Sequence, residues 1–359
     1  MDISKIDKNF TSNKITEKNI DWYNACDEKF TLLGGFYSKD ENRFRRVPKN
    51  IADIVSDGVA HLATHTSGIR LRFSTNSKFI AIKCELDKIW PFSHMPLTGQ
   101  CSFGLTINGI SSKPLMVEHS DYEKSTENST FFENICYLNG ENSDIELYFP
   151  LYNGVKNLFI GLSNNSQIKN HSKTYSYDKP VVFYGSSITQ GGCASKPDNQ
   201  YSAILSKKLN FDFINLGFSG SAKGEKEIIE YSAKLNPLLF VCDYDHNAPT
   251  PEYLDETHFS VYENFRNIQK DTPIIFLSKP DFHDLSVELN TKRREIVYST
   301  YKKALDLGDK NVYFIDGETL FTYEDWDYCT VDGCHPNDLG FYRMAMGILP
   351  ILKDILSKI

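Results

Sequence analysis

Residues 181–192 read Val-Val-Phe-Tyr-Gly-Ser-Ser-Ile-Thr-Gln-Gly-Gly, a short apolar run that passes directly into a turn carrying two serines. Such a run, bounded by glycine, is typical of a strand buried in a parallel sheet. Ser187 therefore stands just beyond the carboxyl end of a predicted strand. Ligands bind at this edge of open α/β sheets, so Ser187 is a candidate nucleophile.

The rest of the second half of the chain repeats this pattern of apolar runs separated by helical periodicity. The predicted strands are 181–184, 211–216, 238–242, 274–277 and 312–315, and the predicted helices are 201–209, 223–235, 253–269, 291–307 and 338–355. Alternating strands and helices predict an α/β fold with a five-stranded, mainly parallel sheet that helices cover on both faces.

The first half has a different pattern, with short alternating segments between turn residues. The clearest are 69–73, 79–83, 102–107 and 144–149. They predict an all-β sandwich, while the polar stretch 164–179 is typical of a linker. Because 359 residues exceed the usual size of one domain, we expect a sandwich domain over 1–170 and a catalytic domain over 171–359.

Composition and charge restrict the classes of partner and the cellular compartment that we expect for this protein. A net charge of -8 without long charged runs gives no footprint for nucleic acid. The longest apolar stretch near the C-terminus, 344–352, contains Pro350 and is too short to span a membrane. Residues 1–10 lack the apolar core of a signal peptide, and the eight cysteines follow no zinc or disulfide spacing. We therefore expect a cytoplasmic protein with reduced thiols and with neither nucleic acid nor a membrane as partner.

A serine nucleophile needs a base within hydrogen-bond reach and a group that orients the base. Residues 331–337 read Val-Asp-Gly-Cys-His-Pro-Asn and follow the fifth predicted strand. Asp332 stands three residues before His335, so both side chains can lie on one side of a turn. The carboxyl end of the fifth strand brings this turn toward Ser187, which predicts a Ser187-His335-Asp332 triad.

Acyl transfer also needs donors for the developing oxyanion, and loops after other strands at the same sheet edge are their expected source. After the second predicted strand, residues 215–220 contain glycines that let a backbone N–H approach a ligand. After the third, residues 243–247 end in Asn247, whose side chain is a candidate donor. A turn-capping role is the alternative for Asn247.

The four blocks supply Ser, Gly, Asn and His in the order of the SGNH, or GDSL-like, hydrolase superfamily, which the second half of the chain resembles. The resemblance implies a flavodoxin-like catalytic fold with the triad Ser187, His335 and Asp332. It also implies oxyanion donors from the backbone of Ser187, from Gly220 and from the Asn247 side chain. A helix-entry role for Gly220 is compatible with this function.

Residues 184–192, 215–220 and 331–340 resemble most a two-domain branch of that superfamily with an N-terminal jelly-roll domain, which 66–76 and 149–155 also resemble. The sequence departs from the branch in three places. The Gly-Asp-Ser block reads Gly-Ser-Ser at 185–187, and the Gly-x-Asn-Asp block reads Asp-His-Asn at 245–247. Residues 102–106 read Ser-Phe-Gly-Leu-Thr, where the branch typically has Gly-Phe-Asp-Leu-Tyr.

Other histidines are weighed as alternatives. His246 is close in sequence to Asp243 and Asp245 and forms a possible second acid-base pair. His61 and His65 are spaced by four, as metal ligands on a helix are, but their surroundings resemble strand and turn, so we expect no metal there.

A loop-like stretch in the first half contains Trp90, Phe92 and His94. We expect these three side chains to pack between the domains. Contact with a substrate over the active site is the alternative.

Relatives with a jelly-roll before the SGNH domain are often carbohydrate esterases that remove acetyl groups. The resemblance therefore implies a serine esterase that cleaves an O-acetyl group from a carbohydrate, without a metal or other cofactor. The expected partner is a small-molecule or oligosaccharide ester substrate. A lipase-like or lysophospholipase-like esterase is the alternative within the enzyme class. A catalytically inactive carbohydrate-binding protein is the alternative outside it, motivated by the altered segment at 102–106.

Overall fold

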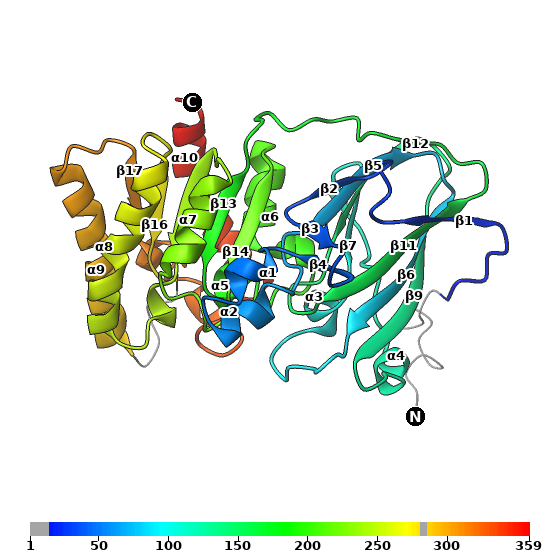
Figure 1. The fold of residues 1–359 in the computed structure, drawn as a ribbon, viewed down its shortest axis with the longest axis horizontal. Coiled ribbons are helices and arrows are strands. Elements are labelled where there is room, and N and C mark those ends of the chain that lie inside the picture. Colours follow the sequence, from blue (N-terminus) through cyan, green and yellow to red (C-terminus); the bar gives the residue numbers. More distant parts are fainter. Residues whose placement is uncertain (1–13, 281–285) are drawn as a thin grey trace.

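The computed structural model describes residues 14–280 and 286–359. The stretch 1–10, from which no signal peptide was expected, lies outside the described residues. The chain forms two halves side by side, one built of antiparallel strands and the other of alternating strands and helices (Figure 1). This is the division of fold types that the two sequence patterns predict.

The first half contains two large antiparallel sheets and a small one, in which β3 (Phe36–Ser38) pairs with β4 (Arg43–Arg45). One large sheet has the order β1 (Ile20–Asn24), β11 (Val155–Ser163), β6 (Phe79–Asp87), β9 (Ser129–Tyr137). The other has the order β12 (Ile168–Lys169), β5 (Arg70–Thr75), β10 (Ser143–Tyr148), β7 (Gly104–Ile107), β8 (Ile110–Ser111), with β2 (Thr31–Leu33) also paired to β5. Side chains from both sheets share one buried cluster, so the sheets pack face to face as a sandwich. The jelly-roll connectivity stays a prediction.

The second half contains a five-stranded sheet in which every pairing is parallel. Its order is β14 (Phe213–Gly217), β13 (Val181–Gly185), β15 (Leu239–Asp243), β16 (Ile274–Leu277), β17 (Val312–Ile315). This 2-1-3-4-5 order is that of flavodoxin-like sheets, whose ligands bind at the carboxyl edge near the first strand. The predicted parallel sheet is confirmed.

Helices cover both faces of this sheet because alternate side chains of each strand point to opposite faces. Val181 and Phe183 share a core with one group of helices, and Val182 and Tyr184 share a core with the other. The first group is α6 (Tyr201–Leu209) and α10 (Asp338–Leu356), and the second is α7 (Lys226–Lys234), α8 (Pro251–Ile268) and α9 (Val287–Asp306).

A segment from the first half joins the second core. The short helices α1 (Lys49–Ala52) and α2 (Asp57–Leu62) lie beside the parallel sheet in Figure 1, and the α2 residues Val59 and Leu62 are buried in the same cluster as Tyr184 and Phe218. The two halves therefore share a hydrophobic core, although the boundary near residue 170 stays a prediction.

Arg46 joins the two halves through backbone carbonyls. Its guanidinium donates to the carbonyl oxygens of Leu62 at 2.6 Å and His65 at 2.8 Å in the first half. It also donates to those of Asn215 at 3.0 Å and Gly217 at 2.7 Å in β14 of the second half. Burial lowers the pKa of Arg46 to about 9.

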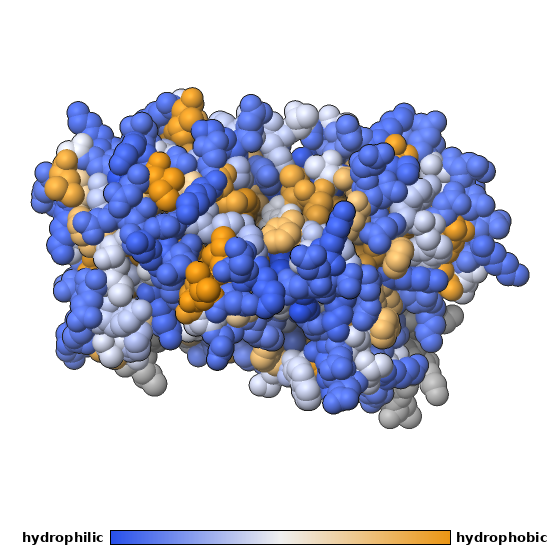
Figure 2. Space-filling view, viewed as in Figure 1, coloured by the Kyte–Doolittle hydropathy of each residue, from blue (hydrophilic) through white to orange (hydrophobic). Residues whose placement is uncertain are grey.

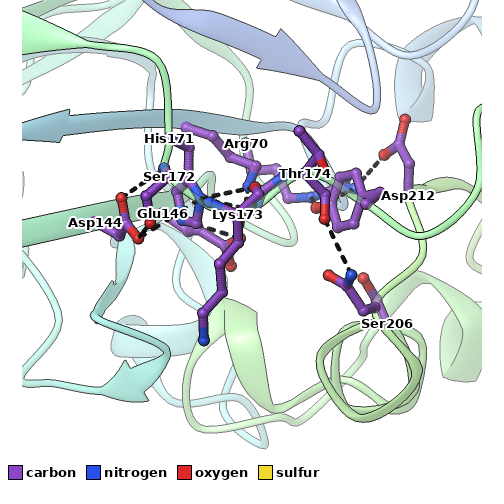
Figure 3. A network of polar contacts seen from close by, with 12 residues as sticks. Arg70, Asp144, Glu146, His171, Ser172, Lys173, Thr174, Ser206 and Asp212 are labelled. Carbon is purple, nitrogen blue, oxygen red and sulfur yellow. Dashed lines mark hydrogen bonds and ion pairs between the residues drawn. The ribbon is translucent and has the colours of Figure 1, made fainter.

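Polar contacts hold the predicted linker, residues 164–179, in place (Figure 3). Arg70 of β5 forms an ion pair with Asp212 and donates to the Tyr175 hydroxyl at 3.2 Å. Neighbouring Arg72 donates to the carbonyl oxygen of Lys173 at 3.0 Å. Arg70 thus ties the sandwich to the second half, and the linker is held against the sandwich.

The face of the molecule in Figure 2 is mostly hydrophilic, and its hydrophobic side chains gather in small separate groups. Within 14–280 and 286–359, none of the helices combines the length and the apolar character that a membrane-spanning segment requires.

Candidate active site

Ser187 is the first residue of the one-turn helix α5 (Ser187–Gln190), which starts immediately after β13. The Ser186 side chain caps this helix by accepting a hydrogen bond from the backbone N–H of Ile188 at 3.1 Å. Ser186 N–H itself donates to the Asp243 carbonyl oxygen of β15 at 2.9 Å. Two neighbouring strands therefore fix the helix that carries Ser187, as its position at the sheet edge predicts.

The structure brings the three predicted triad residues into one hydrogen-bonded chain. Ser187 Oγ lies 2.9 Å from His335 Nε2, and His335 Nδ1 lies 2.7 Å from Asp332 Oδ2. Asp332 holds the proton of the ring on Nδ1, which leaves the lone pair of Nε2 for the serine proton. This arrangement can convert Ser187 into a nucleophile.

A tight turn holds Asp332 and His335 together. The other carboxylate oxygen of Asp332 accepts the backbone N–H groups of Cys334 at 3.0 Å and His335 at 2.8 Å. Partial burial acts to raise the pKa of Asp332, but these bonds and the imidazole outweigh it and hold the pKa below its ordinary value. Asn337 caps α10 directly after the turn, which fixes its exit.

The alternative acid-base pair of His246 and Asp245 is present, but its hydrogen bonds are to residues other than Ser187. His246 Nδ1 lies 3.0 Å from Asp245 Oδ1, and both residues are in a short 3-10 helix, η4 (Asp245–Asn247). The Asp245 carboxylate also accepts the backbone N–H of Lys279 at 3.0 Å. The contact with Ser187 Oγ belongs to His335.

The predicted oxyanion donors come from the loops after β14 and β15. Asn247 donates through Nδ2 to the carbonyl oxygen of Phe218 at 3.0 Å, and an amide nitrogen carries a second N–H. Gly220 is exposed and has a φ of +63°, which disfavours any residue with a side chain. Ser219 N–H donates to Gln190 Oε1 at 3.0 Å, which ties this loop to the helix of Ser187.

Residues of the first half also contact the segment that carries Ser187, and sequence reasoning assigned no role to them. Tyr152 donates its hydroxyl hydrogen to the carbonyl oxygen of Ser187 at 3.1 Å. Buried Gln190 donates to the Leu151 carbonyl oxygen at 3.1 Å and lies 3.2 Å from His65 Nδ1. The sequence feature that could have pointed to these contacts is the stretch 149–155, which resembles the first domain of the two-domain branch.

The expectation that Trp90, Phe92 and His94 pack between the domains is wrong. All three are exposed, with Trp90 at 68%. They lie between β6 and α3 (Leu97–Gln100), and the His94 ring centroid is 5.6 Å from that of His335. His94 therefore lies beside the imidazole of His335, and contact of this loop with a substrate stays a prediction.

The altered segment at 102–106 has a steric explanation. A side chain on Gly104 of β7 would place its Cβ 2.6 Å from a carboxylate oxygen of Asp198. Asp198, from the short 3-10 helix η3 (Pro197–Asn199), accepts a hydrogen bond from the Ser111 hydroxyl. A carboxylate from the second half thus occupies the space beside the position where the related branch has aspartate.

Metal-ligating side chains gather in two places within the described residues, at Asp243, Asp245 and His246 and at His94, Cys193 and His335. The expectation of strand and turn around His61 is wrong, because His61 lies in α2. His65 is buried, and burial together with nearby His61 and arginines holds its pKa well below the ordinary value.

Comparison with protein families divides the chain in the same way as the fold. Residues 178–353 match the GDSL-like lipase/acylhydrolase family. Residues 20–168 match the N-terminal domain of SGNH-hydrolase-type esterases. No curated protein matches the sequence.

Solved structures share the two-part architecture. A protein from Bacteroides ovatus described as a GDSL-like lipase is 28% identical with a TM-score of 0.82, over 94% of this chain and 98% of that chain. A salicylyl-acyltransferase from a tetracycline biosynthetic pathway is 17% identical with a TM-score of 0.77, over 94% and 97%. An acetyl xylan esterase from the rumen bacterium Butyrivibrio proteoclasticus is 15% identical with a TM-score of 0.60, over 95% and 99%.

Proposed function

We propose that the chain is a serine esterase with the triad Ser187, His335 and Asp332, from the premise that residues 178–353 belong to the GDSL-like lipase/acylhydrolase family of ester hydrolases. The observation that carries the proposal is the contact of 2.9 Å between Ser187 Oγ and His335 Nε2. The bond of 2.7 Å from His335 Nδ1 to Asp332 continues this contact and orients the base.

The reaction has two acyl-transfer steps. His335 Nε2 takes the proton of Ser187 as Oγ attacks the ester carbonyl carbon, and it then gives this proton to the departing alcohol. Water attacks the acyl-serine next, while His335 takes its proton and returns it to Ser187 Oγ as the acid leaves. The carboxylate of Asp332 stabilises the imidazolium of both steps, and its lowered pKa keeps it ionised.

The tetrahedral intermediates carry a negative oxygen that needs donors. Ser187 N–H lies at the start of α5, where backbone N–H groups are unpaired in a helix. Gly220 N–H and the second N–H of Asn247 come from the two adjacent loops at the same sheet edge. Together these three donors are the proposed oxyanion hole.

An O-acetylated carbohydrate is the proposed substrate. The fold is shared with an acetyl xylan esterase. The exposed ring of Phe92 lies 6.1 Å from that of His94, which is 5.6 Å from that of His335, and it offers an apolar surface for the face of a sugar ring. Trp90 is a second exposed ring on the same loop. A cytoplasmic location stays a prediction.

The test compares purified wild type with Ser187→Ala on p-nitrophenyl acetate and on a panel of acetylated mono- and oligosaccharides, with acetate as the readout. We expect acetate release by wild type and a loss of at least about 10³-fold in kcat for the variant. A series of p-nitrophenyl esters of increasing acyl length measures chain-length preference, and we expect acetate to be hydrolysed fastest.

Release of equal amounts of acetate by Ser187→Ala would contradict the serine mechanism. A preference for long acyl chains would contradict the acetyl assignment and favour a lipase-like enzyme. Binding of glycans by a folded wild type that hydrolyses none of the esters would favour a binding protein.

A further inference from the structure

Two side chains that can bind a metal ion lie close to His335 of the proposed triad, which is itself a possible ligand. The three side chains are His94 from the loop between β6 and α3, Cys193 from the loop after α5, and His335. One ligand atom from each lies within 4.8 Å of the other two. Three segments far apart in the sequence thus supply one imidazole-thiol-imidazole group.

This donor set matches zinc. Imidazole nitrogen and thiolate sulfur are the ligands that Zn²⁺ prefers, and three protein ligands leave a fourth position for water. Ligands at zinc distances stand about 3.5 Å from one another in a tetrahedron, so side-chain shifts of about 1 Å close this group around an ion. His94 is exposed, which gives the ion access from solvent.

The two additional ligands are not engaged elsewhere, and because burial raises the pKa of the Cys193 thiol to about 12, a metal ion binds it by displacing its proton. Within the described parts of the chain, neither the His94 ring nor the Cys193 thiol takes part in a hydrogen bond that would have to be broken. Cys193 is 2% exposed and has a φ of +75°, a conformation that few residues other than glycine adopt. Its backbone conformation is therefore imposed by the loop that places the thiol beside His335.

The hydrogen bonds of His335 decide which of its nitrogens can bind the ion. Nδ1 is held by Asp332 at 2.7 Å, an arrangement that commonly supports a zinc-bound histidine from the outer side. The remaining ligand atom is Nε2, which also contacts Ser187 Oγ at 2.9 Å. A metal ion and the serine proton therefore compete for the same lone pair.

We propose that His94, Cys193 and His335 form a Zn²⁺ site whose occupation removes the general base and switches the esterase off. The switching effect rests on the proposed serine mechanism, whereas metal binding rests on the three ligands alone. The Ser187 side chain is not a ligand, so Ser187→Ala keeps the site.

Co²⁺ is the probe for binding, because a tetrahedral Co²⁺ ion with a thiolate ligand absorbs visible and near-ultraviolet light. We expect one equivalent of Co²⁺ to give two absorption bands in wild type and in Ser187→Ala. One is the visible band of the tetrahedral Co²⁺ ion, and the other is the near-ultraviolet band of its bond to the thiolate. The thiolate band should be lost in Cys193→Ser, and binding should weaken at least tenfold in the surface variant His94→Ala. Cys26→Ser removes an exposed cysteine elsewhere and should match wild type.

Inhibition is measured separately with Zn²⁺ and p-nitrophenyl acetate. We expect loss of wild-type activity that EDTA reverses, and at least a tenfold higher inhibitory concentration for His94→Ala. Co²⁺ bands in a protein without esterase activity would support the site and contradict the proposed function. Absence of the thiolate band in wild type, or equal zinc inhibition of wild type and His94→Ala, would overturn the metal site.

Discussion

The hydroxyl of Tyr152 donates a hydrogen bond to the backbone carbonyl oxygen of Ser187 at 3.1 Å, so a residue of the first half contacts the backbone of the proposed nucleophile in the second. The same carbonyl accepts the backbone N–H groups of Gly191 at 3.1 Å and Gly192 at 2.8 Å. Tyr152 therefore orients a carbonyl that is already satisfied by its own loop.

Tyr152→Phe should lower kcat by about three- to tenfold and leave KM within about twofold, because one hydrogen bond is worth about 0.5–1.5 kcal/mol and the ring packing is kept. Steady-state kinetics on p-nitrophenyl acetate measure this. A change in KM alone would mean that Tyr152 contacts the substrate instead of positioning Ser187.

Asn247→Ala should lower kcat by about 10²- to 10³-fold if its amide donates to the oxyanion. The carbonyl oxygen of Phe218 also loses a donor, so the melting temperature must be measured beside kcat. Asn247→Asp is the matched variant, since it keeps the size but replaces the amide with an acceptor. Unchanged kcat in the alanine variant would remove Asn247 from the mechanism.

Arg46→Met should lower the free energy of unfolding by at least about 3 kcal/mol, because buried carbonyl oxygens of both halves lose their charged donor. Urea unfolding followed by tryptophan fluorescence measures the loss. Lys49→Met is the control, because Lys49 pairs with Asp53 on the exposed surface and should contribute less than about 1 kcal/mol. Equal stability of the two variants would contradict the bridging role of Arg46.

Acid should destabilise the fold through buried His258, whose pKa is lowered to about 4 by burial although Asp245 acts to raise it. Between about pH 6.5 and about pH 4 the unfolded chain binds a proton that the folded chain does not. Stability therefore falls by about 1.4 kcal/mol per pH unit for this group as the pH drops. His258→Gln should reduce the slope of unfolding free energy against pH by the amount that corresponds to about one proton. An unchanged slope would contradict a neutral buried His258.

Much of the catalytic half could be predicted because its signals are local. Each strand of the parallel sheet is an apolar run bounded by turn residues, and the predictions for β16 and β17 agree with the observed bounds. The proposed triad could be predicted from the sequence for the same reason. Ser187 follows one strand directly, and the pair Asp332 and His335 is contained in one short turn.

Contacts between distant segments could not be predicted from those signals. The helices α1 and α2 are four and six residues long, too short for a clear amphipathic pattern, yet α2 packs against Phe218 in the second core. His94 likewise meets His335 only because a loop of the sandwich crosses the sheet edge. No local spacing records such a meeting.

The most direct test of the central claim is covalent labelling with a fluorophosphonate, followed by peptide mass spectrometry of the folded enzyme. We predict one label per chain, on Ser187, with no label in Ser187→Ala and labelling slowed at least about 10²-fold in His335→Ala. A label on another serine in wild type, or equal labelling of Ser187 with and without His335, would contradict Ser187 as the nucleophile activated by this histidine.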